Sequence, residues 1–264
     1  MRPEMRVIVF AGLVLTGLLI ASAAAQDAQP THPVYPAQDG GVREVMESIV
    51  IPPIPNAPFT ARLSTEWARP TPDGGTITLV NEREIARDNE GRVYEQRWSL
   101  VPKNGNVKSS LTWVQVADPN EHTLYNCNAI KLVCDLLAYN PASDLAAAAP
   151  RTVVQGPLRN GHGTIESENL GTKIVDGLET VGTRQTITLS PGAIGNDRTV
   201  VKMTESWRAE QLAVNLISVR SDPISGKQTF TVTELDTNPP DPQLFEPPEG
   251  FKIADQRATR PPSD

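Results

Sequence analysis

Histidines are the side chains that most readily exchange protons near neutral pH, and the sequence has three of them, His32, His122 and His162. His32 lies in a proline-rich leader. His162 lies in a glycine-flanked loop, where it could serve a hydrolase together with nearby carboxylates, although a solvated loop histidine is the commoner case. The sequence has no G-x-S-x-G nucleophile motif, no H-E-x-x-H or EF-hand metal motif, and no phosphate- or dinucleotide-binding glycine loop. We therefore predict that the protein is not an enzyme and has no catalytic residue, metal site or cofactor.

The two cysteines, Cys127 and Cys134, are separated by six residues that could form the tip of a hairpin. A disulfide across such a hairpin would join two neighbouring strands. The alternative is a redox or metal pair, but redox pairs usually have C-x-x-C spacing, and only His122 and Asp135 lie nearby as further metal ligands. We predict a structural disulfide, which the chain-entropy model expects to stabilise the fold by about 2 kcal/mol.

Large apolar side chains on the predicted strands could line a cavity for a hydrophobic ligand. The alternative is that these residues belong to the protein core, which is where tryptophan and leucine are most often found. Aromatic residues make up only 5% of the chain, which argues against a carbohydrate-binding module with exposed stacking rings. The predicted ligand-binding residues are Leu63, Trp67, Trp98, Leu100, Trp113, Trp207 and Leu216.

The first 25 residues have the pattern of a cleaved export signal. Arg2 and Arg6 precede an apolar run over residues 7–20, and small residues at 23–25 favour cleavage after Ala25. The run is shorter than the about 20 residues that a membrane-spanning helix needs, and an uncleaved anchor is the alternative. We predict a periplasmic or secreted protein. Its net charge of −7 argues against a nucleic-acid partner, which would require a basic face.

The rest of the chain is predicted to be mainly β, a large curved antiparallel sheet in the form of a half-barrel or open barrel. Residues 26–58 are expected to be a flexible proline-rich leader with a short helix over 42–50. Residues 59–253 are expected to form a single antiparallel domain of about ten strands joined by tight turns. Its halves, 59–139 and 164–253, are joined by a loop over 140–163 that carries a short alanine-rich helix over 145–149, capped by Ser143 or Asp144. Residues 254–264 are expected to be a disordered tail.

Alternation of side chains gives the predicted strands two different faces. Over residues 59–67, Phe59, Ala61, Leu63, Thr65 and Trp67 share one face. In the second half, the dipeptide at 176–177, Asp-Gly, is a strong signal for a tight hairpin turn.

Motifs in the second half carry a resemblance to a known group. The stretch with Gly177, Glu179 and Gly182 fits a "DG-x-E-x-x-G" strand, and a strand with Trp207 follows it. A closing "LF-x-x-P-x-G" segment is formed by Leu244, Phe245, Pro248 and Gly250. Together these motifs, over about residues 164–253, resemble the outer-membrane lipoprotein carriers (LolA-like proteins) and their lipid-binding half-barrel relatives among exported bacterial proteins. The resemblance implies a short N-terminal helix followed by a strongly curved sheet.

Two functions fit these features. The resemblance implies an envelope protein that binds or carries a lipid or another hydrophobic ligand in a cavity of the curved sheet. The alternative is a non-enzymatic structural or protein-interaction module of the bacterial envelope, with another envelope protein as its partner.

Overall fold

The computed structural model describes residues 48–150, 154–159 and 161–257. The predicted export signal, most of the predicted leader and the last seven residues lie outside this part. Of the predicted helix over 42–50, only residues 48–50 are described, and they have no regular structure. None of the helices in the described part is long and apolar enough to cross a membrane.

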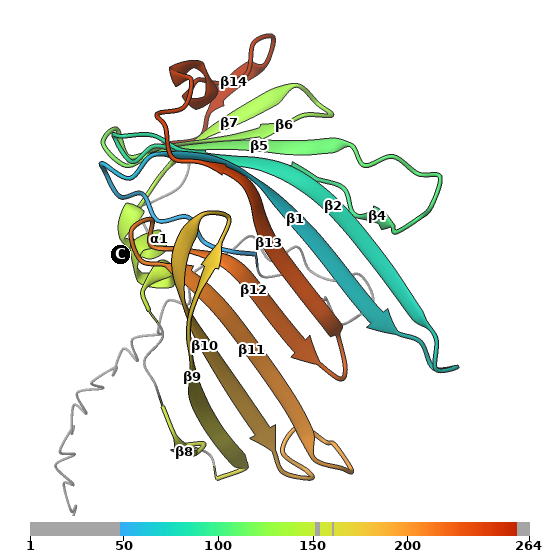
Figure 1. Cartoon of the computed structure of the whole chain (residues 1–264). Helices are drawn as coiled ribbons and strands as arrows, with labels where there is room; N and C mark the ends of the chain where they lie inside the picture. Colours follow the sequence, from blue (N-terminus) through green and yellow to red (C-terminus); the bar gives the residue numbers. More distant parts are fainter. Residues whose placement is uncertain (1–47, 151–153, 160, 258–264) are drawn as a thin grey trace, which may run out of the picture. The chain divides into compact units, whose positions relative to one another are not determined.

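The described chain folds as one open, curved sheet, which confirms the predicted fold class (Figure 1). Fourteen strands take part where about ten were expected, because short edge strands and a broken strand add to the predicted set. The strands are β1 Phe59–Pro70, β2 Thr76–Arg87, β3 Val93–Trp98, β4 Val101–Pro102, β5 Leu111–Asp118, β6 Thr123–Asn128, β7 Val133–Ala138, β8 Gly156–Pro157, β9 Gly163–Val175, β10 Leu178–Leu189, β11 Val200–Ala209, β12 Val214–Asp222, β13 Gly226–Asp236 and β14 Lys252–Asp255.

The strand order is β14-β7-β6-β5-β3-β2-β1-β13-β12-β11-β10-β9-β8, with β4 paired to β2 beside this path. Strands that are neighbours in this order pair antiparallel, except β14, which lies parallel to β7 at one edge. The pairing of β1 with β13 joins the two halves of the sequence into a single sheet, as Figure 1 shows. β14 continues two residues past 253, into the segment that was expected to be a disordered tail.

Local sequence explains the turns and the helix. The turn between β9 and β10 has positive φ at both Asp176 (46°) and Gly177 (83°), the geometry that an Asp-Gly hairpin adopts. Helix α1, Pro141–Ala148, begins four residues earlier than predicted. Its cap is Asn140, not Ser143 or Asp144, because the Asn140 side chain accepts a hydrogen bond from the backbone N–H of Ala142 and Pro141 suits the first helical position.

The sheet has an apolar face, which we call the core face, to which Phe59, Ala61, Leu63, Thr65 and Trp67 of β1 all point. The alternation over β1 is therefore as predicted. Neighbouring strands add Ile85, Leu216, Phe230 and Val232 to this cluster. On the opposite face, a smaller cluster packs beneath the 3-10 helix η2, Pro242–Phe245, whose Phe245 is 4% exposed.

Residues 48–58, part of the predicted flexible leader, pack against the core face as an extended strap. Ile49 and Ile51 of the strap are buried among the core residues. The strap is held by Arg87, whose fully buried guanidinium donates hydrogen bonds to the carbonyl oxygens of Pro52 (2.7 Å), Ala57 (2.9 Å) and, on the turn before β12, Leu212 (2.8 Å). Burial lowers the pKa of Arg87 to about 10, so the side chain remains charged at neutral pH.

Candidate functional site

A split in the sheet opens beside β2. This strand pairs with β3 only at Ile85–Arg87 and with β4 only at Leu79–Val80. Residues 81–84, which lie between these two short ladders, have no strand partner on that side. The chain across the split, residues 96–100, bulges away from β2 because β3 ends at Trp98 and β4 begins only at Val101.

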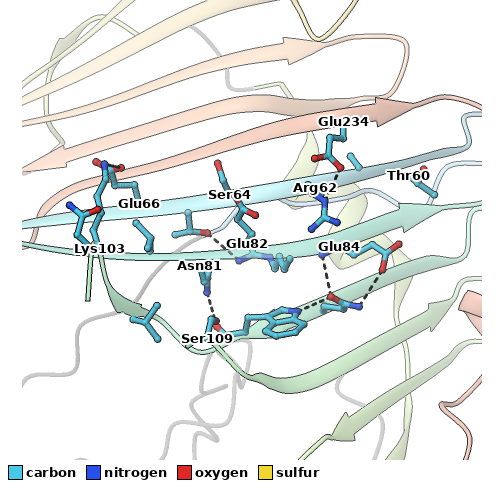
Figure 2. Close-up of a pocket in the computed structure, with 18 residues that line it drawn as sticks. Thr60, Arg62, Ser64, Glu66, Asn81, Glu82, Glu84, Lys103, Ser109 and Glu234 are labelled. Carbon is cyan, nitrogen blue, oxygen red and sulfur yellow. Dashed lines mark hydrogen bonds and ion pairs between the residues drawn. The ribbon is translucent and has the colours of Figure 1, made fainter. Parts of the chain in front are cut away.

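A pocket of about 950 Å³ lies at this split (Figure 2). Its apolar wall is made by Val80, Trp98 and Val101, all of them half-buried. Apart from Ala61, the rest of the lining is polar or charged and comes from β1, β2, β3, the end of β13 and the segment around β4. The lining residues include no histidine, and they include four carboxylates, namely Glu66, Glu82, Glu84 and Glu234.

A chain of hydrogen bonds fixes the ring of Trp98 at the pocket. The indole Nε1–H donates to Gln96 Oε1 (2.7 Å), and Gln96 Nε2 in turn donates to the Tyr94 hydroxyl (2.8 Å) and, at 3.3 Å, to Glu84 Oε2. The Gln96 side chain also accepts from the backbone N–H of Glu84 (3.3 Å), so it takes the place of the missing strand partner. Burial raises the pKa of Tyr94, which keeps its hydroxyl neutral.

Asn81 spans the split from the β2 side. Its Nδ2 donates to the carbonyl oxygen of Trp98 at 2.6 Å. Because that partner is an acceptor, the amide is oriented with Oδ1 on the other side. Asn81 is only 7% exposed, and its Oδ1 has no hydrogen-bond partner among the described residues. Buried acceptors without a donor are uncommon in folded proteins.

The cations of the pocket are already engaged. Arg62 Nε contacts Glu234 at 2.7 Å, and Lys103 Nζ contacts Glu66 at 2.6 Å. Both pairs are about half exposed or more, so each adds little to stability. The guanidinium of Arg83 donates to Thr65 Oγ1 (3.3 Å) and to Ser48 Oγ, which keeps it on the core face.

The predicted ligand-binding residues are not brought together. Leu63 and Leu216, each 1% exposed, are part of the apolar core under the strap. Trp67 and Trp113 also belong to the core face, as the pairings of Trp67 with Gln228 and of Trp113 with Arg97 show. Leu100 lies between β3 and β4, outside the pocket lining. Trp98 is the one member of the predicted set that lines the pocket at the split.

Trp207 lies on the face opposite the core face, where it contacts a separate group of residues. Its ring covers Gly182, where an added Cβ would come within 2.6 Å of a ring carbon. Lys173 Nζ lies 3.7 Å from the ring centroid, and the indole Nε1–H donates to Glu205 Oε1 at 2.8 Å. These contacts give the predicted Gly182 and Trp207 motifs a packing role, because only glycine leaves room for the ring.

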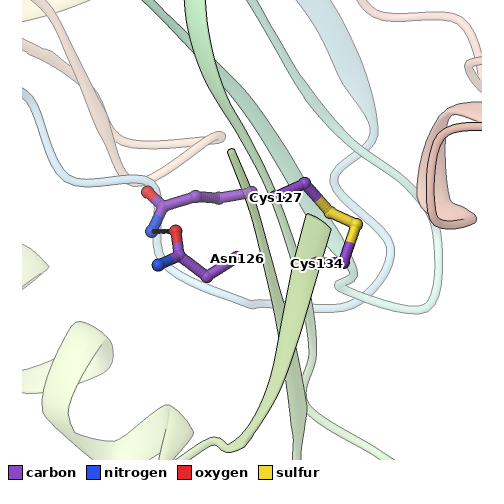
Figure 3. Close-up of a disulfide and its surroundings, with 4 residues drawn as sticks. Asn126, Cys127 and Cys134 are labelled. Carbon is purple, nitrogen blue, oxygen red and sulfur yellow. Dashed lines mark hydrogen bonds between the residues drawn. A yellow bond between two sulfur atoms is a disulfide. The ribbon is translucent and has the colours of Figure 1, made fainter. Parts of the chain in front are cut away.

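The disulfide between Cys127 and Cys134 is present, with an S–S distance of 2.04 Å (Figure 3). The two residues are direct partners across the β6–β7 hairpin and are buried beside Phe245. His162 is exposed in its loop. Within residues 48–150, 154–159 and 161–257, no group of three metal-ligating side chains gathers.

A second polar cluster lies around α1. The hydroxyl of Tyr139 donates to Asp144 Oδ2 at 2.6 Å and so fastens the helix to the chain that leaves β7. Burial and this carboxylate raise the pKa of Tyr139. Burial also raises the pKa of Glu95, against the opposing effect of the positive charges of Arg83 and Arg97.

The polar side of the pocket was not predicted from the sequence. Glu82 and Glu84, at alternating positions of a predicted strand over residues 76–87, are typical of a solvated face, and Gln96 falls within a predicted strand over residues 92–101. The only local signal of the split is the bulge between Arg97 and Trp98, which appears in the pairing with β5 and not in the sequence pattern.

No protein-family model matches the chain, and no curated protein matches its sequence. Among solved structures, MucB matches at 15% identity over 75% of this chain and 60% of that chain, with a TM-score of 0.36. The match thus spans only about three-fifths of MucB. The Mycobacterium tuberculosis lipoprotein LppX matches at 12% identity over 69% and 88% of the two chains, with a TM-score of 0.24.

A LolA superfamily protein from Nitrosomonas europaea matches at 7% identity over 74% of this chain and 92% of that chain, with a TM-score of 0.29. The group that the C-terminal motifs resemble is therefore among the structural matches. Identities and TM-scores this low carry no inference about the function of this chain.

Proposed function

We propose that this protein is a non-enzymatic binding protein of the bacterial envelope, periplasmic or secreted, that holds a lipid or another amphiphilic molecule at the split pocket. The observation that carries the proposal is the mixed lining of this pocket, in which an indole fixed by hydrogen bonds faces a set of charged and amide side chains. Pockets of this size that combine an apolar wall with a few polar groups are typical of small-molecule binding.

The apolar part of the ligand would cover the wall formed by Val80, Trp98 and Val101. These three side chains are half-buried, so a bound chain would remove further apolar surface from water. The core face itself is an unsuitable place for cargo, because Ile49 and Ile51 of the strap already cover it and Arg87 holds the strap. This moves the predicted hydrophobic site from the inside of the sheet to the split beside β2.

A direct test is to extract lipids from the purified protein and to measure displacement of a fluorescent fatty-acid probe. The proposal expects co-purified amphiphile or saturable probe binding, and it expects Trp98→Ala to weaken that binding. Trp113→Ala is the matched control, since Trp113 lies on the core face away from the pocket lining. Protein free of lipid that does not bind the probe would refute the proposed function.

A second candidate, docking on another envelope protein, is favoured by an exposed apolar tip. Ile130 (77% exposed) and Leu132 (51%) form the turn of the disulfide-bonded hairpin, and Ile253 (54%) lies on the adjoining β14. Clustered apolar side chains of this kind often mark interaction surfaces.

Site-specific photo-crosslinking in cells from position 130 should trap one protein if this second candidate holds. The same probe at position 224, an isoleucine in the β12–β13 turn that is also well exposed (65%), should not. Equal labelling from both positions would argue against a docking tip.

A further inference from the structure

We propose that the hairpin tip, formed by residues 129–132 of the β6–β7 turn together with Lys252 and Ile253 of β14, docks on an anionic lipid surface. The tip lies at the edge of the sheet where β14 pairs with β7 (Figure 1). None of its residues lines the split pocket, so the proposal goes beyond the proposed function. Exposed aliphatic side chains, lysines among them and the backbone of the turn support it.

The hairpin tip exposes three large aliphatic side chains close together. Ile130 and Leu132 belong to the turn, and Ile253 follows Lys252, whose backbone N–H donates to the carbonyl oxygen of Leu132 at 2.9 Å. All three aliphatic side chains are more than half exposed. Because such side chains gain free energy when they leave water, three of them at one tip favour contact with an apolar or interfacial environment.

The hairpin tip is also basic. Lys131 lies between the two exposed turn residues, and Lys252 precedes Ile253. Both lysines are exposed, and neither is in an ion pair among the described residues. A lysine can lay its aliphatic stem along apolar surface while its ammonium group reaches an anionic head group. Aliphatic side chains flanked by lysines therefore match a lipid surface, which has an apolar interior beneath charged head groups.

The acidic residues near the hairpin tip lie outside it. The nearest along the chain, Asp255, is paired with Arg257 at 2.5 Å. Asp135 lies deeper in the sheet, opposite Ala254. The whole chain has a net charge of −7, so an anionic membrane repels the protein as a whole and attracts this basic tip. The charge distribution thus favours a lipid surface over the protein partner of the second candidate function, and it orients the tip toward the lipid.

Leu132 has a backbone conformation that suits glycine or asparagine better than leucine. Its φ is +51°, in the left-handed region. Asn128 holds the turn in this form, because its Oδ1 accepts hydrogen bonds from the backbone N–H groups of Ile130 (3.0 Å) and Lys131 (2.9 Å). A leucine that is both strained and exposed lowers the stability of the fold, and contact with a lipid surface accounts for its presence.

Co-sedimentation of the exported, purified protein with lipid vesicles tests the proposal. One set of vesicles contains equal parts of phosphatidylglycerol and phosphatidylcholine, and the other contains phosphatidylcholine alone. We expect the protein to bind the anionic vesicles about twentyfold more tightly, as two lysines at an anionic surface imply. High salt should weaken this binding without abolishing it, since salt does not screen the apolar contact.

Leu132→Asn should move two measurements in different directions. Asparagine tolerates positive φ and removes the exposed leucine, so Tm should stay the same or rise while affinity for the anionic vesicles falls about tenfold. If Leu132 had only a structural role, Tm would fall and vesicle binding would not change. Ile194→Asn, at a similarly exposed isoleucine in the β10–β11 loop, is the control and should leave vesicle binding unchanged.

The double variant Lys131→Gln, Lys252→Gln should lower affinity for the anionic vesicles about twentyfold and leave binding to phosphatidylcholine vesicles unchanged. The matched control is the double variant Arg198→Gln, Lys227→Gln, which removes the same charge from exposed positions outside the hairpin tip. This control should change the affinity by no more than about twofold, because distant exposed charges are screened.

Absence of binding to the anionic vesicles would overturn the proposal, and so would tip variants that bind them as tightly as the parent does. Photo-crosslinking of a single protein from position 130, by a parent that does not bind vesicles, would show that the tip docks on a protein instead. The proposed function is tested separately by the fatty-acid probe and Trp98→Ala, which should leave vesicle binding unchanged. Either claim can therefore fail while the other stands.

Discussion

Replacing Gly182 by alanine should destabilise the protein through a single contact with Trp207. The backbone of Gly182 does not have positive φ, so an alanine would cause no strain in the main chain. Its Cβ, however, would lie 2.6, 2.7 and 2.8 Å from three carbons of the Trp207 ring. Since carbon atoms pack at about 3.5 Å or more, the ring has to move by about 1 Å.

The size of the effect follows from what the ring loses when it moves. A shift of about 1 Å takes the indole Nε1 out of hydrogen-bonding range of Glu205, a bond to a charged group worth about 1.5–3 kcal/mol. The contact with Lys173 adds about 0.5–1 kcal/mol. Replacing a strand glycine returns about 0.5–1 kcal/mol. The expected net loss is about 2 kcal/mol, which lowers Tm by about 4–8 °C in a domain of this size.

Thermal and urea unfolding of four proteins measure this coupling: the parent, Gly182→Ala, Trp207→Val and the double variant. In the Trp207→Val background the alanine should be neutral or slightly stabilising, because the ring that it would strike is gone. Gly171→Ala is the control. Gly171 is paired directly with Gly182 but has open space around it and φ of +79°, so its cost of about 1 kcal/mol comes from the backbone and should persist in both backgrounds.

The reasoning fails if Gly182→Ala costs the same with and without Trp207. A cost below about 0.5 kcal/mol in the parent would contradict it as well, since that is the ordinary range of a surface substitution.

Three further predictions concern the strap, an ion pair and the disulfide. Arg87→Met should lower the free energy of unfolding by about 2 kcal/mol, because three buried carbonyl oxygens lose their donor, a loss only partly offset by removal of a buried charge. Urea unfolding with an unchanged m-value would measure this loss, and an unchanged stability would contradict the role of Arg87 in holding the strap. For Glu205, burial would raise the pKa, but hydrogen bonds from Trp207 and Arg184 outweigh it and lower the pKa. The ionised Glu205 therefore stabilises the fold above about pH 4.3, the pKa of glutamate in the unfolded chain, and this contribution is lost as the pH falls through the lower pKa of the folded state. The difference in unfolding free energy between the parent and Glu205→Gln should therefore shrink in acid. A difference that stays constant from about pH 6 to pH 3 would argue against this. Replacing both Cys127 and Cys134 by serine should cost about 2 kcal/mol, and reductant should lower the Tm of the parent but not of this variant.

Much of the fold can be predicted from the sequence because strand signals are local. Alternation over residues 59–67 correctly assigns the buried face of β1, and the Asp-Gly turn at 176–177 identifies the β9–β10 hairpin. The cysteine spacing likewise predicts the disulfide, since hairpin partners a few residues apart are placed side by side by the turn. The helix cap was wrong because Asn140 competes with Ser143 and Asp144 for the same role, and only the path of the chain selects one of them.

The candidate site could not be predicted in this way. Trp67, Trp98, Trp113 and Trp207 look alike in the sequence, yet two lie on the core face, one lines the split and one covers a glycine. Which of these environments a tryptophan meets depends on the neighbouring strand, and that strand can come from a distant part of the chain.

The sequence by itself determined that this is a β protein with alternating strands, tight turns and a hairpin disulfide, because each of these features depends on residues close together along the chain. The tertiary structure alone decided where the pocket lies. The pocket exists because β2 pairs with β3 at one end and with β4 at the other, leaving residues 81–84 without a partner in between. Such a gap is a property of strand pairing, which is set by the packing of the whole sheet and not by any one segment.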